Sequence, residues 1–118
     1  DVQIAFYRIT QEALNNVVKH ARAHQASVRL CYNCKDQPAT SHTTEAKQPQ
    51  ETGLSVLLSI SDDGRGFDPT QITHDRLGLG IMQERAQAIG AALTVESQPG
   101  HGTRVNVLWK QESKQETP

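Results

Sequence analysis

Apolar residues repeat at helical spacing in two segments of the chain, 2–22 and 78–89. In the first segment the apolar stripe, widened by Leu14 and Val18, comprises Val2, Phe6, Ile9, Ala13, Val17 and Ala21. In the second segment it comprises Leu79, Met82, Ala86 and Ile89. Gly90 follows the second segment, and glycine is common just after the last turn of a helix. The pattern therefore predicts two amphipathic helices.

Four other segments have the pattern of β-strands: 26–33, 54–61, 93–97 and 103–110. In the first, Val28, Leu30 and Tyr32 share a face. In the second, the residues expected to face the core are Leu54, Val56, Leu58 and Ile60. The element order α-β-β-α-β-β predicts an α+β fold, a two-layer sandwich with helices on one face of a mixed, mostly antiparallel sheet.

Three segments lack the apolar residues that order a chain. Residues 34–53 contain no large aliphatic side chain, so we expect a long, mobile insertion between two strands. Residues 67–77 form a polar loop, and the polar tail 111–118 is expected to fray. The remaining sequence is enough for one domain, which we place at 1–110.

Composition excludes several classes of protein. The formal net charge of −1 gives no indication of the basic surface with which proteins bind nucleic acid. No apolar run is long enough to span a bilayer. We expect a cytoplasmic domain, either of a soluble protein or as the cytoplasmic part of a membrane-bound one. The chain starts at Asp1, directly in a helical pattern, and we expect it to be a piece of a longer protein. Cys31 and Cys34 lack the second ligand pair of a structural zinc site, and we expect two reduced thiols.

The strand at 54–61 runs into two adjacent carboxylates and a glycine-rich loop, SISDDGRGF. Because side chains alternate along a strand, Asp62 is expected to point inward and Asp63 toward solvent. A buried carboxylate needs a hydrogen-bond donor. Either Asp62 caps the glycine turn through backbone N–H groups, or it accepts from a ligand such as the amino group of a purine. In the second case Gly64 and Gly66 would let the backbone approach the ring.

Three polar residues of the first helix, Glu12, Asn16 and Lys19, fall within a narrow arc beside the apolar stripe, flanked by Asn15 and His20. Such an arc is usually a solvated face. Alternatively, the amide oxygen of Asn16 suits Mg²⁺, the lysine suits phosphates, and the glutamate is placed to orient or activate a nucleophile.

Two further stretches have one structural and one functional interpretation. Gly78 and Gly80 lie where a loop becomes a helix, which is either a flexible helix start or an anion site made of free N–H groups. The spacing fits neither a Walker loop nor a Rossmann fingerprint. Thr103 opens the last strand with its hydroxyl on the inner face, either as an ordinary β-branched residue or as part of a site.

Taken together, these stretches resemble the catalytic ATP-binding domain of bacterial sensor histidine kinases, in the superfamily of gyrase, Hsp90 and MutL. FYRITQEALNNVVKHARA (6–23) resembles the N box of the nitrate/nitrite-sensor branch. DDGRGF resembles the first glycine box, GLGIMQERAQAIGA the second, and GHGTRVNV the closing Gly-Thr. The resemblance covers about 6–110, apart from the insertion.

The resemblance implies a Bergerat-type sandwich that holds ATP under a flexible lid. Asp62 would accept from the adenine amino group, Asn16 would hold Mg²⁺, and Glu12 would be the N-box acid. The other nucleotide-binding residues implied are Lys19, His20, Gly64, Gly66, Phe67, Gly78, Leu79, Gly80, Ile81 and Thr103.

The resemblance also implies partners that this sequence does not contain. A kinase of this family phosphorylates a histidine on a dimerisation domain, relays the phosphoryl group to a response regulator, and acts as a homodimer. None of the five histidines here has that helical context, so we expect ATP binding without autophosphorylation by this chain alone. The strand usual before the N box is also missing, which predicts a sheet one strand short.

The alternative function is a nucleotide-controlled binding module of the anti-sigma-factor type. KHA after the N-box asparagine and GLGIMQER favour the kinase.

Overall fold

The computed structural model describes residues 1–34, 53–68, 70 and 78–111. The predicted mobile insertion, most of the 67–77 loop and the tail lie outside these residues, apart from their first or last positions. The described elements follow the predicted order. They are α1 (Val2–Asn16), the π-helical segment η1 (Val17–Ala21), β1 (Ala26–Tyr32), β2 (Ser55–Asp62), α2 (Leu79–Ala88), β3 (Ala92–Ser97) and β4 (Thr103–Lys110).

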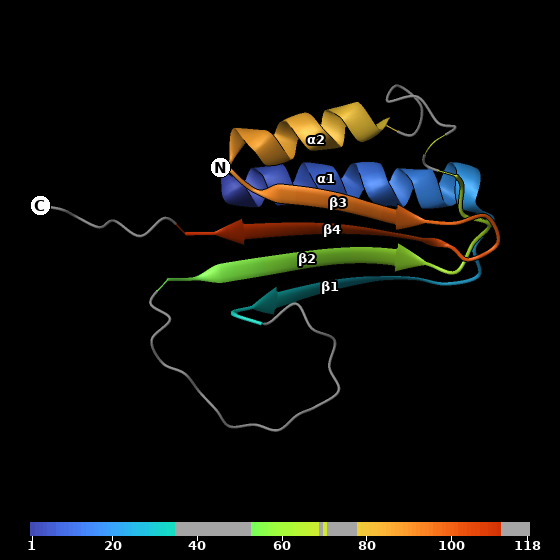
Figure 1. Cartoon of the computed structure of the whole chain (residues 1–118), viewed down its shortest axis with the longest axis horizontal. Helices are drawn as coiled ribbons and strands as arrows, with labels where there is room; N and C mark the ends of the chain where they lie inside the picture. The colour runs from blue at the N-terminus through green and yellow to red at the C-terminus, as the bar shows by residue number, and fades with distance from the viewer. Residues whose placement is uncertain (35–52, 69, 71–77, 112–118) are drawn as a thin grey trace, which may run out of the picture.

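The four strands form one sheet in the order β1-β2-β4-β3, and all three pairings are antiparallel. Both helices lie on the same face of this sheet, as Figure 1 shows. The α+β two-layer sandwich predicted from the element order is therefore confirmed, with a sheet that is wholly antiparallel in the described residues and not mixed. In the described part of the chain no strand precedes α1, and the sheet has the four strands predicted from the sequence.

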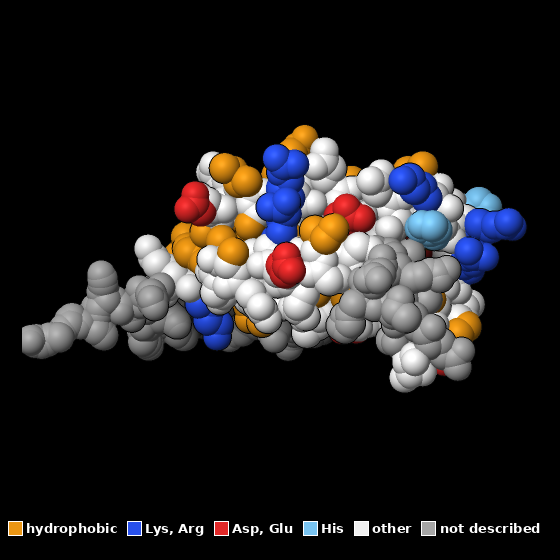
Figure 2. All heavy atoms as spheres, turned by 90° about the horizontal axis from the view of Figure 1, so that it is seen from above, with side chains coloured by type: hydrophobic (Ala, Val, Ile, Leu, Met, Phe, Trp, Pro, Cys, Tyr) orange, Lys and Arg blue, Asp and Glu red, His pale blue; other side chains and the backbone are white. Residues whose placement is uncertain are grey.

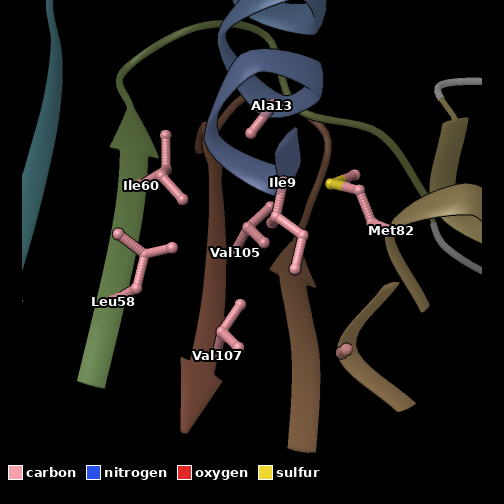
Figure 3. Packing of buried hydrophobic residues seen from close by; sticks show 8 residues of the cluster. Ile9, Ala13, Leu58, Ile60, Met82, Val105 and Val107 are labelled. Carbon is pink, nitrogen blue, oxygen red and sulfur yellow. The ribbon is translucent and has the colours of Figure 1, made fainter. Parts of the chain in front are cut away.

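The core lies between the helices and the central strands (Figure 3). Its largest fully buried side chains are Ile9 on α1, Met82 on α2 and Val107 on β4. On β2 the residues Val56, Leu58 and Ile60 are buried, so the predicted alternation of this strand is confirmed. Since β2 extends to Asp62, the same parity carries that carboxylate to the helix side of the sheet.

The first helix changes its geometry near its C-terminus. After Asn16 the backbone continues as the π-helical η1, and Arg22 ends it in the left-handed conformation with φ 54°. A π-turn rotates the following side chains relative to an α-helix. Val18, predicted to widen the apolar stripe, is consequently 82% exposed. That prediction was wrong because it assumed one uniform helical period.

The edge strand β1 keeps its apolar face largely uncovered. Val28, Leu30 and Tyr32 pair with Ile60, Leu58 and Val56 and therefore lie on the helix side of the sheet. They nevertheless remain 46–60% exposed, whereas their partners on β2 are buried. The helices pack over β2 and β3, so the strand was predicted correctly but lies beyond the helix layer.

Cys31 and Cys34 form a disulfide, so the expectation of two reduced thiols was wrong. Asn33 between them has φ 57°, which turns the chain back after β1. This turn brings the two Cα atoms to 5.8 Å, a separation that a disulfide spans. Asn33 is held in place because its N–H donates to the Ser55 carbonyl and its Oδ1 accepts from the Ser55 N–H, both at 2.7 Å. Spacing alone did not reveal this turn.

Among the described residues, no helix combines the length and apolar character needed to cross a bilayer.

Candidate functional site

A pocket of about 170 Å³ opens between the C-terminal part of the first helix and the ends of β2 and β4. Its lining is mostly apolar and includes a few polar groups, which is the usual composition of a small-molecule site. The lining residues are Ala13, Asn16, Val17, His20, Ala21, Ile60, Asp62, Arg65, Gly66, Phe67, Leu79, Met82, Val95, Thr103 and Val105. Seven residues singled out from the sequence are among them: Asn16, His20, Asp62, Gly66, Phe67, Leu79 and Thr103.

Asp62 is the last residue of β2 and is half-buried at the pocket wall. Its Oδ1 accepts a hydrogen bond from the Gly64 N–H at 2.7 Å. The carboxylate therefore does cap the glycine turn. A carboxylate has two oxygens and about four lone-pair directions, so this bond leaves acceptor capacity for a ligand in the pocket. The structural and the ligand-binding interpretations of Asp62 are compatible.

Asp63 is exposed, as predicted, yet it has a structural role that the sequence did not reveal. Its Oδ1 accepts from the backbone N–H groups of His24 and Gln25, at 2.8 and 3.0 Å. These bonds tie the end of the first helix to the end of β2. The backbone N–H of Gln25, followed by that of His24, holds the pKa of the Asp63 carboxyl below its ordinary value of 3.8.

This lowered pKa predicts an acid-dependent loss of stability. The folded state favours ionised Asp63, so the contribution is present above pH 3.8 and disappears as the pH falls through the folded pKa. Asp63→Asn should therefore lower the melting temperature at neutral pH, by a margin that shrinks toward zero in acid. Thermal denaturation across this pH range checks it, with Glu84→Gln, an exposed carboxylate on α2, as the control. A margin independent of pH would contradict the role given to the charge.

The two glycines of the loop after β2 are required because backbone atoms of other segments approach them closely. A Cβ at Gly64 would overlap the carbonyl oxygen of Ala21. At Gly66, which has φ 63°, a Cβ would overlap the carbonyl oxygen of Gln98. Sequence reasoning attributed both glycines to the approach of a ligand. The structure gives an internal reason for both glycines, of which Gly66 also lines the pocket.

Gly64→Ala should destabilise the fold by about 1–3 kcal/mol, because the added methyl meets backbone that cannot move aside easily. Gly53→Ala is the matched control, since the nearest atom to its Cβ is the Gln111 carbonyl oxygen at 3.4 Å. Chemical denaturation followed by circular dichroism measures both variants. Equal stability of the two would show that the loop yields to the methyl group.

The polar residues near the C-terminal end of the first helix differ in whether they line the pocket. Asn16 ends α1 and lines the pocket, as does His20 on η1. Lys19 is exposed and is not a lining residue. The backbone of η1 is anchored, because the His20 carbonyl accepts from Arg65 Nε at 2.8 Å and the Ala21 carbonyl accepts from the Arg65 N–H at 2.8 Å.

Glu12 lies against the start of α2. Its carboxylate occupies the space that a Cβ at Gly78 would need, and Gly78, with φ 62°, is the residue before the helix. Glu12 itself does not line the pocket. At the start of α2, Leu79 lines the pocket, whereas Gly80 and Ile81 do not. Ile81 is 52% exposed.

The pocket end of the molecule also gathers cationic side chains. Figure 2 shows Lys, Arg and His side chains concentrated at one end, and Figure 1 places the C-terminal end of the first helix and the loop after β2 there. Lys19, His20 and Arg22 belong to that helix end, and Arg65 belongs to the loop. Cations near a site attract anions. This end of the pocket therefore suits a ligand with phosphate groups.

Thr103 takes part in a hydrogen-bond network that joins three loops. Its Oγ1 lies 2.8 Å from the hydroxyl of Ser97, the last residue of β3. The Ser97 hydroxyl also accepts from the Phe67 N–H at 2.9 Å and donates to the Gly102 carbonyl at 3.1 Å. Sequence reasoning found Thr103 and Phe67 but missed Ser97 and Arg65. A sequence shows no long-range hydrogen bonds, so neither residue gave a usable signal.

The arrangement suits a flat ring with a polar edge and an anionic tail. Ile60, Val95 and Val105 supply an apolar floor, and Asp62 and Thr103 supply oxygen atoms beside it. Within the described residues, no group of three or more His, Cys, Asp or Glu side chains gathers as metal ligands.

The sequence of residues 1–113 matches the family described as "Histidine kinase-, DNA gyrase B-, and HSP90-like ATPase". Curated relatives include DegS of Brevibacillus brevis, a signal transduction histidine-protein kinase/phosphatase, which is 32% identical over 104 residues. That match covers 88% of this chain and 22% of DegS. Sensor protein VraS of Staphylococcus haemolyticus is 34% identical over 101 residues, covering 86% of this chain and 24% of VraS.

Solved structures with a similar fold include the histidine kinase domain of the blue-light activated histidine kinase of Erythrobacter litoralis EL346. The TM-score is 0.52 at 25% identity, and the match covers 86% of this chain and 41% of that domain. For the longer chain of the same kinase the TM-score is 0.54, with coverage of 86% and 28%. The chain thus spans about a quarter of the length of its curated relatives.

Proposed function

Because the chain belongs to the histidine kinase-, DNA gyrase B- and HSP90-like ATPase family, we propose that it is the ATP-binding catalytic domain of a two-component sensor histidine kinase. The observation that carries the proposal is the half-buried carboxylate of Asp62. It accepts from the Gly64 N–H at the wall of a mostly apolar pocket, and the basic side chains of η1 and of the loop after β2 lie at the same end of the molecule. The sensor-kinase names of the relatives support the kinase rather than a plain ATPase.

The adenine ring occupies the apolar part of the pocket. Ile60 and Val105 contact its face, and Asp62 accepts a hydrogen bond from the exocyclic amino group. Thr103 lies directly opposite Asp62 in the β2–β4 register and adds a second oxygen at the same edge. Phe67 and Gly66 close the pocket from the loop that follows β2.

The phosphates extend toward the cationic end. His20 and Lys19 on η1 lie near them, and residues 78–81 present the N-terminal N–H groups of α2. The amide oxygen of Asn16 would hold Mg²⁺, an ion that typically keeps several waters and takes other ligands from phosphates. The position of Asn16 in the pocket lining fits this role. When bound, Mg²⁺ neutralises charge on the phosphate oxygens.

The reaction transfers the γ-phosphoryl group of ATP to an imidazole nitrogen. A nitrogen–phosphorus bond forms, the bond from phosphorus to the β,γ-bridging oxygen breaks, and ADP leaves. Glu12 accepts the proton that the imidazole loses, because its carboxylate lies beside Gly78 at the start of the phosphate-binding helix. The acceptor histidine belongs to a dimerisation domain of the same homodimeric protein. A response regulator takes the phosphoryl group from it, in the cytoplasm.

The test is phosphoryl transfer by the full-length parent protein with ATP labelled at the γ-position. We expect label on protein that is stable in base and labile in acid, as phosphohistidine is, and none on the 118-residue chain incubated alone. If the parent binds ADP but gains no label, and instead binds a partner protein only in one nucleotide state, the alternative of an anti-sigma-type module holds.

A further inference from the structure

Ser97 lies outside the pocket lining, yet its hydroxyl contacts two of the residues that form it. Its Oγ is 2.9 Å from the Phe67 backbone nitrogen, 2.8 Å from Thr103 Oγ1 and 3.1 Å from the Gly102 carbonyl oxygen. Ser97 ends β3, and these partners come from the loop after β2 and from the turn that leads into β4. One hydroxyl therefore joins all three strand ends at the pocket.

The protons in this network can be assigned by counting donors and acceptors. A backbone N–H only donates and a carbonyl oxygen only accepts, whereas a serine hydroxyl has one proton and two lone pairs. Ser97 therefore accepts from Phe67 and donates its proton to Gly102. All three contacts are satisfied at once only if the Thr103 hydroxyl donates to Ser97.

This assignment fixes what Thr103 presents to the pocket. With its proton directed to Ser97, the Thr103 oxygen can act toward a ligand only as an acceptor. Asp62, paired with Thr103 across the β2–β4 ladder, is also an acceptor when ionised. The pocket edge then carries two neighbouring acceptors. An amino group with two N–H donors matches these two acceptors. A ring carbonyl in the same place would bring its oxygen lone pairs against theirs.

We propose that Ser97 is a positioning residue that sets nucleotide specificity, by holding the Thr103 hydroxyl as an acceptor and the Phe67 backbone at the pocket wall. This inference rests on the proposed binding of an adenine nucleotide. Ser97 then contributes to the preference for a purine with a 6-amino group over one with a 6-oxo group, although Ser97 itself does not touch the ring.

The test compares ADP with inosine diphosphate, which carries a 6-oxo group in place of the 6-amino group, by calorimetry on the 118-residue chain. Ser97→Ala should reduce the ratio of the two affinities by about three- to tenfold, the effect of one neutral hydrogen bond. Ser97→Thr retains the hydroxyl and should restore the ratio. Ser61→Ala is the control, because among the described residues its hydroxyl is hydrogen-bonded to the exposed Ser27 hydroxyl, 3.1 Å away, and to none of the residues that line the pocket.

The possible outcomes separate this inference from the proposed function. If wild-type protein binds ADP and Ser97→Ala lowers both affinities equally, the residue is only structural and the inference is overturned. If Ser97→Ala does not fold, Ser97→Cys provides the same comparison, since a thiol is a weak donor and acceptor in nearly the same volume. If wild-type protein binds neither nucleotide, the proposed function fails and the inference fails with it.

Discussion

Asp62→Asn is expected to weaken ADP binding by about 10- to 100-fold, since a hydrogen bond to a charged group contributes about 1.5–3 kcal/mol. An amide also offers an N–H donor where the carboxylate offered a lone pair, and that donor faces the donors of the adenine amino group. GDP, which lacks this amino group at position 6, should lose less. Calorimetry with both nucleotides measures the difference.

Asp63→Asn is the matched control for this variant. It makes the same change of charge at the next residue, but its carboxylate bonds the backbone of His24 and Gln25 instead of facing the pocket. We expect nearly wild-type ADP affinity at a temperature where both variants are folded. An unchanged ADP affinity in Asp62→Asn would contradict the adenine assignment.

Asn16→Ala should abolish phosphoryl transfer in the full-length kinase while leaving the domain folded. Asn16 is half-buried at the pocket and is not one of the buried core residues, so the packing of the core is unchanged in the variant. Losing a ligand of Mg²⁺ removes the charge neutralisation on which phosphoryl transfer depends. The measurement is incorporation of labelled phosphate, together with the melting temperature.

Asn15→Ala is the matched control for Asn16→Ala. Asn15 is the neighbouring asparagine on α1, is exposed and does not line the pocket. The Asn15 variant should autophosphorylate like the wild type. Near wild-type labelling in the Asn16 variant would refute the metal role.

Much of the fold could be predicted because two periodicities dominate the sequence. Alternation along β2 placed Ile60 in the core and Asp62 at its edge, and the helical stripe placed Ile9 and Ala13. These are local signals, and each depends on side-chain spacing within one element. The prediction failed at Val18, where the helix becomes π-helical, because periodicity analysis assumes a constant turn.

The site could be predicted less completely, since part of it depends on contacts between segments far apart in the chain. Asp63 bonds residues nearly forty positions away, and Ser97 joins Phe67 to Thr103. Gly64 is required by the carbonyl of Ala21, on another element. No spacing rule reports such contacts. The turn at Asn33 that closes the disulfide was missed for a related reason, because backbone conformation there depends on pairing with β2.

The most direct test of the central claim is a crystal structure of this chain with ADP and Mg²⁺. We expect adenine between the helix layer and the sheet, with its amino group within hydrogen-bonding distance of the Asp62 carboxylate and of Thr103 Oγ1. We also expect the phosphates at the end of the pocket where His20 of η1 and Leu79 at the start of α2 belong to its lining. Adenine bound elsewhere, or Asp62 turned away from the ring, would contradict the claim.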